Sequence, residues 1–529
     1  MSNLVGTGKL IGFILKRDRR RLVIWVLVLG LLPIATANAF FELTPTEADR
    51  ERMAATAIAN PAFQAILGPI HGTSIGALTA WRVGTIGAVL VALMAILTVI
   101  RHTREEEESG RAELLGSTVL GRHALAVAAV TVVSVAGLGL ALVITAGLTG
   151  LGLPLAGSIV LGLGYGMVAV SFAAVAVLAA QLTEGAGAAR GIAVGALGVA
   201  FLLRAVGDAT DLSIFSWLSP IGWFSQLRAF AGEAAWVFAL YIGLAILAAG
   251  AALALASSRD LGAGVLPPRK GPATAAPWLR SPLALAARLQ RGALVGWAAG
   301  VATIAVVYGS IANSVGDLLV DNPQLAEIFE MLGGERGIVD AFFGAAMGIF
   351  AVITAAYATR TVLRLRVEEE TQRADPILAT TTSRPRWMVS HLFFAFFGSM
   401  AILLLAGLVA GSIYGAVVGD LGDNVLRVLG AALVQVPAVW VMAALAAALY
   451  GFSPRLTQAS WGALVVFLLF GQLGQILQLP QWMLNLSPFS HVPAFPVESL
   501  NATPLILLLG VAGALLAAGI TGFQRRDLA

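Results

Sequence analysis

The sequence contains no cysteine among its 529 residues, so it forms no disulfide bonds and offers no thiolate ligands for zinc or iron–sulfur clusters. Its five histidines do not occur in an HExxH or similar metal-binding pattern. We therefore predict no metal site. Charged side chains are also scarce, at 12% of the residues, whereas soluble domains usually have about 25%. This scarcity excludes an ordinary soluble domain.

Apolar residues, in contrast, make up 58% of the chain, and the mean hydropathy is +0.87. They occur in runs of about 20 residues, the length that a helix needs to cross a hydrocarbon core about 30 Å thick. The sequence predicts an all-α polytopic membrane protein with twelve transmembrane helices. The predicted spans are residues 22–42, 82–100, 122–149, 157–181, 190–207, 234–257, 291–311, 338–358, 388–413, 426–450, 459–476 and 503–522.

Lysine and arginine gather before the first span, in every second loop and at the C-terminal end. The positive-inside rule therefore places both termini and these loops in the cytoplasm. The pI of about 9.7 follows from this one-sided distribution and does not indicate nucleic-acid binding. A cleaved signal peptide, ending near Ala37 and Ala39, is the alternative for the first apolar run. The run is longer than the apolar region of a usual signal peptide, and an equivalent segment recurs in mid-chain, so we predict a retained span.

The chain also repeats itself after about 260 residues. A shift of 262 residues superposes Arg104 on Arg366, Glu106 to Glu108 on Glu368 to Glu370, Arg111 on Arg373, and Glu113 on Asp375. With small gaps, Leu218-Ser219-Pro220 matches Leu486-Ser487-Pro488. We predict a tandem duplication of two six-helix halves, residues 1–257 and 282–529, joined by a Pro-rich cytoplasmic linker, residues 258–281. Because six is even, the halves share one orientation, with an axis along the membrane normal.

Two acidic clusters, Glu105 to Glu108 and Glu368 to Glu370, follow the second span of each half. Taken alone, such a run is usually a solvated face, but its duplication favours a function. We predict short helices with ion pairs four residues apart, Glu107 with Arg111 and Glu369 with Arg373. Acidic side chains on a basic side of the membrane are suited to dock into a basic groove of another protein.

The pattern RxREEExGRxELL, its degenerate second copy and the duplicated twelve-span layout resemble the permeases of ABC exporters, in particular those similar to polyketide-antibiotic exporters of actinobacteria. The resemblance implies a pseudo-dimeric exporter permease in a bacterial plasma (inner) membrane, with hydrophobic compounds such as antibiotics as substrates. It also implies that the two acidic loops are coupling helices that contact the ATPase. By this resemblance the coupling residues are Glu105, Glu106, Glu107, Glu108, Arg111, Glu113, Glu368, Glu369, Glu370, Arg373 and Asp375.

An exporter driven by ATP needs a P-loop, and the chain contains no GxxxxGK[S/T] sequence. The nearest fragment, GSTVLGRH from Gly116, lacks the Lys-Ser/Thr pair. We therefore predict that the chain is not an enzyme and binds no cofactor. Two copies of a cytoplasmic ABC ATPase, which bind ATP and Mg, are the expected partners, together with membrane lipid and a hydrophobic substrate.

The resemblance also implies that the second and fifth spans of each half meet at a central pathway. Their small and soft side chains predict an adaptable apolar wall, although Gly and Ala equally serve close helix packing. The candidates are Gly84, Gly87, Ala92, Met94, Phe201, Phe342, Met347, Phe350, Phe467 and Phe470, with Gln472 and Gln475 as sparse polar contacts. Arg204 and Asp208 are four residues apart near the outer end of the fifth span, where they form either a structural ion pair or part of an outer gate.

Short amphipathic segments are predicted on both sides of the membrane. Interfacial helices are expected before the first span of each half, because KLIGFILKRDRRR and PLALAARLQRG combine an apolar face with a basic end. External helices are expected to start at Asn60-Pro61 and Asn322-Pro323, with Asn as N-cap and Pro as first helical residue. Gly68 and Gly333 are suited to end them.

Two other functions are compatible with parts of the sequence. A twelve-helix proton-coupled secondary transporter would share the layout of two six-span halves, but no Asp or Glu lies centrally in the predicted spans. A membrane-embedded transferase would need a metal-binding acid pair, for which Asp208 with Asp211 or Asp420 with Asp423 are candidates. No histidine or basic cluster accompanies these acids, which favours solvated loops.

Overall fold

The computed structural model describes residues 4–59, 61–112, 120–210, 212–259, 262–266, 273–317, 334–473, 480–498 and 500–526. Within these ranges every regular element is helical and there is no strand. The predicted all-α polytopic class is therefore confirmed. The chain divides into two compact units, Met1–Gly271 and Pro272–Ala529.

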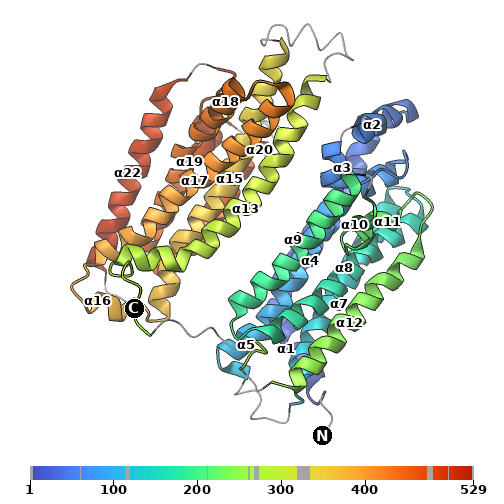
Figure 1. Ribbon diagram of the computed structural model, residues 1–529, viewed down its shortest axis with the longest axis horizontal. Helices are drawn as coiled ribbons and strands as arrows, with labels where there is room; N and C mark the ends of the chain where they lie inside the picture. Colours follow the sequence, from blue (N-terminus) through green and yellow to red (C-terminus); the bar gives the residue numbers. More distant parts are fainter. Residues whose placement is uncertain are drawn as a thin grey trace. The chain divides into compact units, whose positions relative to one another are not determined.

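The first unit is a bundle of six long helices that run side by side (Figure 1). They are α1 (Thr7–Leu43), α4 (Ile75–Arg101), α7 (Ala124–Gly150), α8 (Leu155–Leu182), α9 (Ala186–Ala209) and α12 (Phe238–Ser257). Shorter elements connect them. These are α2 (Glu47–Ala59), α3 (Pro61–Leu67), α5 (Arg104–Glu108), α10 (Ile214–Trp217), α11 (Gly222–Gln226) and η1 (Ala235–Val237).

The second unit repeats this order, except that two shorter helices, α18 (Leu421–Leu433) and α19 (Val436–Phe452), occupy the place of the single helix α8. Its other long helices are α13 (Pro282–Asp317), α15 (Gly334–Glu370), α17 (Arg384–Val418), α20 (Ala459–Leu473) and α22 (Ala502–Arg525). The short elements are α16 (Asp375–Leu378), η2 (Pro454–Gln458), α21 (Gln481–Leu484) and η3 (Pro488–His491).

Eleven segments of the described chain are long and apolar enough to cross a membrane, one fewer than predicted. The difference is the expected span 459–476. Its helix α20 is described over 15 residues, Ala459–Leu473, and residues 474–479 lie outside the described part. The segment Leu421–Phe452 counts once although it comprises two helices. They are separated at Val434 and Gln435 because Pro437, in the first turn of α19, has no N–H to continue the hydrogen-bond ladder.

The duplication appears in the packing as well as in the sequence. In the first unit α1 packs on α7, α4 on α8 and α9, and α12 on α8. The corresponding pairs of the second unit are α13 on α17, α15 on α19 and α20, and α22 on α19. The repeated Leu-Ser-Pro sequences also act alike, because Ser219 donates to the carbonyl of Ala200 in α9 and Ser487 donates to that of Phe467 in α20. The two halves are therefore copies of one fold.

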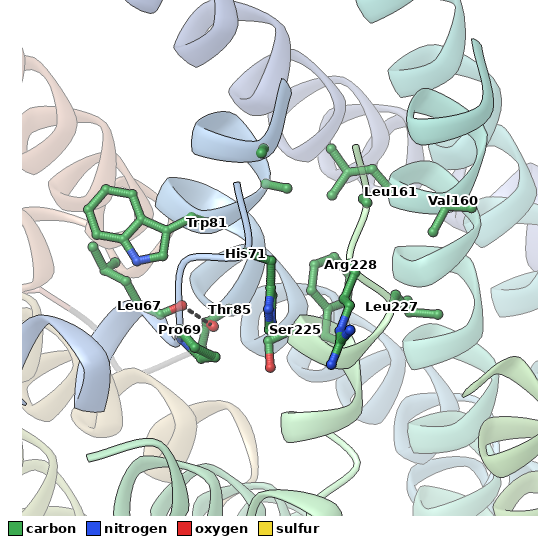
Figure 2. A pocket seen from close by; sticks show the side chains of 14 residues that line it. Leu67, Pro69, His71, Trp81, Thr85, Val160, Leu161, Ser225, Leu227 and Arg228 are labelled. Atoms are coloured by element: carbon green, nitrogen blue, oxygen red, sulfur yellow. Dashed lines mark hydrogen bonds between the residues drawn. The ribbon is translucent and has the colours of Figure 1, made fainter. Parts of the chain in front are cut away.

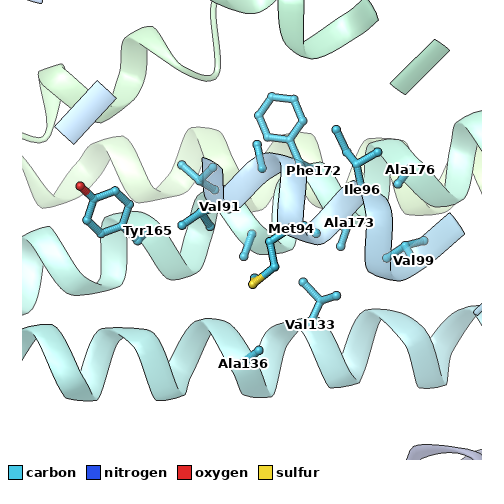
Figure 3. Packing of buried hydrophobic residues seen from close by; sticks show 14 of the residues in the cluster. Val91, Met94, Ile96, Val99, Val133, Ala136, Tyr165, Phe172, Ala173 and Ala176 are labelled. Carbon is cyan, nitrogen blue, oxygen red and sulfur yellow. The ribbon is translucent and has the colours of Figure 1, made fainter. Parts of the chain in front are cut away.

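Small side chains bring the helices of each half together. Figure 3 shows Met94 of α4 extending toward Val133 of α7, while Phe172 and Ala173 of α8 pack alongside. Lipid tails are as apolar as these side chains, so excluding water does not drive the helices together inside a membrane. Their association depends on close van der Waals contact, which explains why alanine and glycine are so frequent where the helices meet.

The amphipathic segments before the first spans are not separate helices. The basic segment of the first half forms the initial turns of α1, a single helix of 37 residues, and the corresponding segment of the second half starts α13. At 1.5 Å per residue α1 is about 55 Å long, well beyond a hydrocarbon core of about 30 Å. In Figure 1 the first turns of α13 run at an angle to the rest of the helix.

The predicted external helix of the first half is present as α3, which starts at Pro61. Gly68 follows its last residue with φ +97°, a left-handed conformation that favours glycine at a helix end. Asn60 and the equivalent segment of the second half, residues 318–333, lie outside the described residues.

Candidate functional site: the acidic loops and the buried Arg204

Glu107 is the centre of the first acidic loop. Arg259, which follows α12, donates from Nη1 to Oε2 and from Nη2 to Oε1 of Glu107, each at 3.0 Å. Arg104 contacts the same carboxylate at 2.5 Å. Although Arg104 is completely buried, its guanidinium also donates to the backbone carbonyls of Glu184 and Gly262. This pair of arginines fastens α5 to two distant segments of the unit.

The other glutamates of α5 also have partners within the chain. Glu106, which is buried, accepts a hydrogen bond from Arg17 of α1 at 2.7 Å. Glu108 accepts from the backbone amide of Ala186, at 2.8 Å, and so caps the first turn of α9. Glu105 forms an ion pair with Arg190 of the same helix. The acidic run is therefore neither a plain solvated face nor wholly available to a partner.

The second loop has a smaller set of contacts. Glu369 receives two hydrogen bonds from Arg526, at 2.7 and 2.6 Å, and one from the hydroxyl of Tyr450 at 2.6 Å. Its neighbours form local pairs along the end of α15. Arg364 contacts Glu368 at 2.5 Å and Arg366 contacts Glu370 at 2.6 Å.

The predicted ion pairs Glu107–Arg111 and Glu369–Arg373 are wrong. Arg111 instead lies 3.5 Å from Glu106, and the backbone amide of Arg373 donates to the carbonyl of Glu368. The helical segments end too early for the predicted spacing to apply, because α5 stops at Glu108 and α15 at Glu370. Arg111, Arg373 and Asp375 are exposed. Glu113 lies outside the described residues.

Both loops continue into the same turn. Gly110 has φ +72° and donates its N–H to the carbonyl of Glu107, while Gln372, its counterpart, has φ +56° and donates to Glu369. A left-handed conformation suits glycine, whereas a residue with a side chain is strained there. The second loop therefore keeps the backbone of the first at an energetic cost.

Replacing Gln372 by glycine is expected to stabilise the protein by about 1 kcal/mol, because it relieves this strain. The thermal unfolding midpoint of the purified protein is the measurement. Gln372→Ala is the matched control, since it removes the same side chain but keeps the strained φ. Equal midpoints for the two variants would contradict this account.

Arg204 is the centre of a buried network at the other end of the first unit. Its side chain is 0% exposed and donates from Nη2 to the carbonyls of Ala65 and Ile66, the latter at 3.0 Å. The next two carbonyls of the same segment also have donors. Thr85 donates to Leu67 at 2.8 Å, and Trp81 donates to Gly68 at 3.0 Å. Side chains of α4 and α9 thus satisfy four consecutive carbonyls at the end of α3.

The pairing of Arg204 with Asp208 is present as predicted, at 3.3 Å. Ser216 donates to the other oxygen of Asp208 at 2.5 Å, and the ring of Phe201 lies 4.9 Å from the Arg204 guanidinium carbon. Asp208 therefore belongs to an internal network. Whether the network is also a gate stays a prediction.

The predicted pathway residues are mostly buried within their own half. Cβ atoms at Gly84 and Gly87 would meet Phe224 at 2.9 Å and the hydroxyl of Tyr165 at 2.4 Å. Ala92, Met94, Met347 and Phe350 are buried, Phe342 stacks on Tyr308, and Phe467 and Phe470 are half-buried. Gln472 is in α20, without a described side-chain environment, and Gln475 lies outside the described residues. Their pathway role stays a prediction.

The candidate metal-binding acids have other roles in the structure. Asp420 is the N-cap of α18 and accepts from the amide of Asp423, whose side chain is 3.8 Å from Arg427. Arg427 also pairs with Asp340. Among the described residues no group of three His, Asp or Glu is placed to hold a metal ion.

Two cavities lie among the described residues of the first unit. The larger, of about 450 Å³, lies next to Glu107 and Arg259 and is walled by apolar side chains such as Leu125, Val177 and Leu253. Its volume is within the range that accommodates a drug-sized ligand. The smaller, of about 30 Å³, lies beside Thr85, His71 and Arg228 and is too small for such a molecule (Figure 2).

The multidrug efflux system permease protein Rv1217c of Mycobacterium tuberculosis is 40% identical over 529 residues, which cover 100% of this chain and 96% of that protein. The chain belongs to this permease family. The family model described as the C-terminal domain of multidrug efflux system permease Rv1217c matches residues 279–524, which include all the long helices of the second unit except the last residue of α22. The permease is thus a multi-pass membrane protein of a multidrug efflux family.

Sequence interpretation missed the partners of the central glutamates in this permease. Arg259 and Arg526 belong to basic clusters that the positive-inside rule already explains. Nothing in the sequence marks Gln181, which contacts Arg259, or Tyr450, which contacts Glu369. A signal was available, because an arginine lies within two residues after the last long helix of each half. Local spacing rules gave no reason to connect it with the acidic loop.

Proposed function

We propose that this chain is the membrane-spanning permease subunit of an ATP-driven ABC exporter for hydrophobic compounds. The observation that supports the proposal most is the acidic loop, which occurs at the same place in both halves with a bidentate arginine–glutamate pair in each. Two equivalent loops suit two copies of an ATPase. The ATPase subunits, and not this chain, would bind ATP and Mg. A relative that is named as a multidrug efflux permease supports drugs as the substrates.

The contacts divide each loop into an inner and an outer part. Glu106, Glu107 and Glu369 are engaged inside the permease and would set the position of the loop. Exposed residues after them, such as Arg111 and Arg373, would meet the ATPase. The docking surface thus includes basic as well as acidic side chains, as the predicted coupling residues already did.

Co-expression with its partner ATPase should yield a complex of one permease and two ATPase chains. Its mass and its ATP hydrolysis are the measurements. In proteoliposomes a hydrophobic drug should accumulate only with ATP and Mg present. Transport by the permease alone, driven by a proton gradient, would contradict the proposal and restore the secondary transporter.

The location that goes with this function is a bacterial plasma membrane, with both termini and both acidic loops in the cytoplasm. The cysteine-free sequence makes this directly testable. A single cysteine in place of exposed Ser109 should react with a membrane-impermeant maleimide only after the cells are opened. Labelling in intact cells would reverse the orientation.

A further inference from the structure

We propose that two equivalent three-residue clusters are the positioning residues that transmit movement of the acidic loops to the helix bundles. The first cluster consists of Glu107, Arg259 and Gln181, and the second of Glu369, Arg526 and Tyr450. The proposal rests on the proposed function, because it assumes that an ATPase moves the loops. It assigns a specific role to side chains that lie behind the docking surface.

In the first cluster one arginine connects three elements. Arg259 follows α12, holds Glu107 of α5 through two hydrogen bonds, and donates from Nε to Oε1 of Gln181 at 2.8 Å. Gln181 is the penultimate residue of α8. The side chains of Arg259 and Glu107 are only 9% and 13% exposed, so water screens their attraction less than at an open surface.

The second cluster connects the same three elements of the other half. Arg526 follows α22 and holds Glu369 through two hydrogen bonds. Tyr450, near the end of α19, donates to Glu369, and its ring lies 5.0 Å from the Arg526 guanidinium carbon. The third residue differs between the halves, yet it comes from the equivalent helix: Gln181 contacts the arginine, and Tyr450 contacts both the arginine and the glutamate. The arrangement is thus retained although its chemistry has changed.

The position of the clusters suits transmission. Bidentate arginine–carboxylate pairs fix orientation as well as distance. A displaced loop would therefore pull the segment after α12, or after α22 in the second half, along with it. The third residue extends the connection to α8 or α19. Each of these helices packs against several others, α8 against α4, α7 and α12, and α19 against α15, α17 and α22. A movement delivered there reaches most of the bundle.

Other ion pairs of the loops do not meet these conditions. Glu105 is 49% exposed in its pair with Arg190, and Glu370 is 51% exposed in its pair with Arg366 four residues earlier on the same helix. Exposed pairs of this kind contribute little. Asp49 with Arg52 in α2 and Asp423 with Arg427 in α18 are also partly exposed local pairs, and they provide the controls because they lie outside the acidic loops.

The test uses the complete permease–ATPase complex in proteoliposomes, with ATP hydrolysis and uptake of a hydrophobic fluorescent dye measured on the same sample. In Glu107→Gln/Glu369→Gln we expect the number of dye molecules moved per ATP to fall at least tenfold while the ATPase stays bound. Asp49→Asn/Asp423→Asn, which removes one carboxylate from an exposed pair in each half outside the acidic loops, should stay within about twofold of the wild type. An unchanged ratio in the first variant, or an equal loss in the second, would overturn the proposal.

A milder variant and a rescue cover the case in which the double variant does not assemble. Tyr450→Phe keeps the ring over Arg526 but loses the hydroxyl hydrogen bond, and it should lower the ratio about threefold. The exchange Glu369→Arg/Arg526→Glu restores an ion pair with its charges reversed. It should move more dye molecules per ATP than Glu369→Arg alone or Arg526→Glu alone. No effect of Tyr450→Phe together with no recovery by the exchange would overturn the proposal. If the wild-type complex itself shows no ATP-dependent uptake, the proposed function fails instead.

Discussion

Arg204→Met is expected to destabilise the permease by about 3–5 kcal/mol, the cost of removing one partner from a buried charge pair. The substitution leaves Asp208 without its cation and removes the donor from the carbonyls of Ala65 and Ile66. Unsatisfied groups are costly here because neither lipid nor protein around them replaces the lost hydrogen bonds. The amount of folded protein extracted from membranes and its thermal midpoint are the measurements.

Arg190→Met provides the control on the same helix, since Arg190 forms a partly exposed pair with Glu105. Its thermal midpoint should stay close to that of the wild type. Arg204→Lys keeps the charge but not the forked donors, so an intermediate loss is expected. If Arg204→Met is as stable as Arg190→Met but does not transport, the network acts as an outer gate and its structural role is minor.

Gly519→Val is expected to separate α22 from α19 and to lower the yield of folded permease severalfold. A Cβ at Gly519 would lie 2.7 Å from the carbonyl oxygen of Ala447, and one at Gly451 would lie 2.0 Å from that of Gly519. Both obstacles are backbone atoms, so no side-chain rotation relieves them. Overpacking usually costs about 1–3 kcal/mol, and contact with rigid backbone belongs at the upper end.

Gly513→Val is the matched control for this prediction. Gly513 lies on the same helix, six residues earlier, and a Cβ there would have nothing within 4 Å. It introduces the same β-branched side chain and therefore the same change in helix propensity. Equal yields and equal thermal midpoints for the two variants would show that the α19–α22 contact does not need glycine.

The two halves differ in how firmly the acidic loop is held. In the first half the glutamates reach α1, α9 and the segment after α12. In the second half Glu368 and Glu370 pair only with arginines four residues before them on the same helix, so Glu369 carries the long-range connection. Alanine replacements at Glu106 to Glu108 and at Glu368 to Glu370 should therefore impair transport unequally, with the larger effect in the first half.

The helical class and most of the spans follow from local sequence, and the internal repeat is visible there too. The physical reason is that a backbone in lipid must satisfy its own hydrogen bonds, so each long apolar run has to become a helix. The Pro61 start and the Gly68 end of α3 were equally predictable, because capping depends on residues that are close in sequence. The match of the Leu-Ser-Pro segments also predicted correctly that both halves fold alike.

Only the tertiary structure decided which side chains meet. Glu107 and Arg259 are 152 residues apart, and Glu369 and Arg526 are 157 apart, so helix packing and not local spacing brings them together. The same holds for the glycines, since nothing in the sequence distinguishes Gly519, which touches another backbone, from Gly513, which does not. The rule for pairs four residues apart holds for Glu368 and Glu370, whose arginines lie earlier on the same helix. It failed for Glu107 and Glu369, because a carboxylate binds the donors that the fold fixes nearest to it, and here these come from distant segments of the chain.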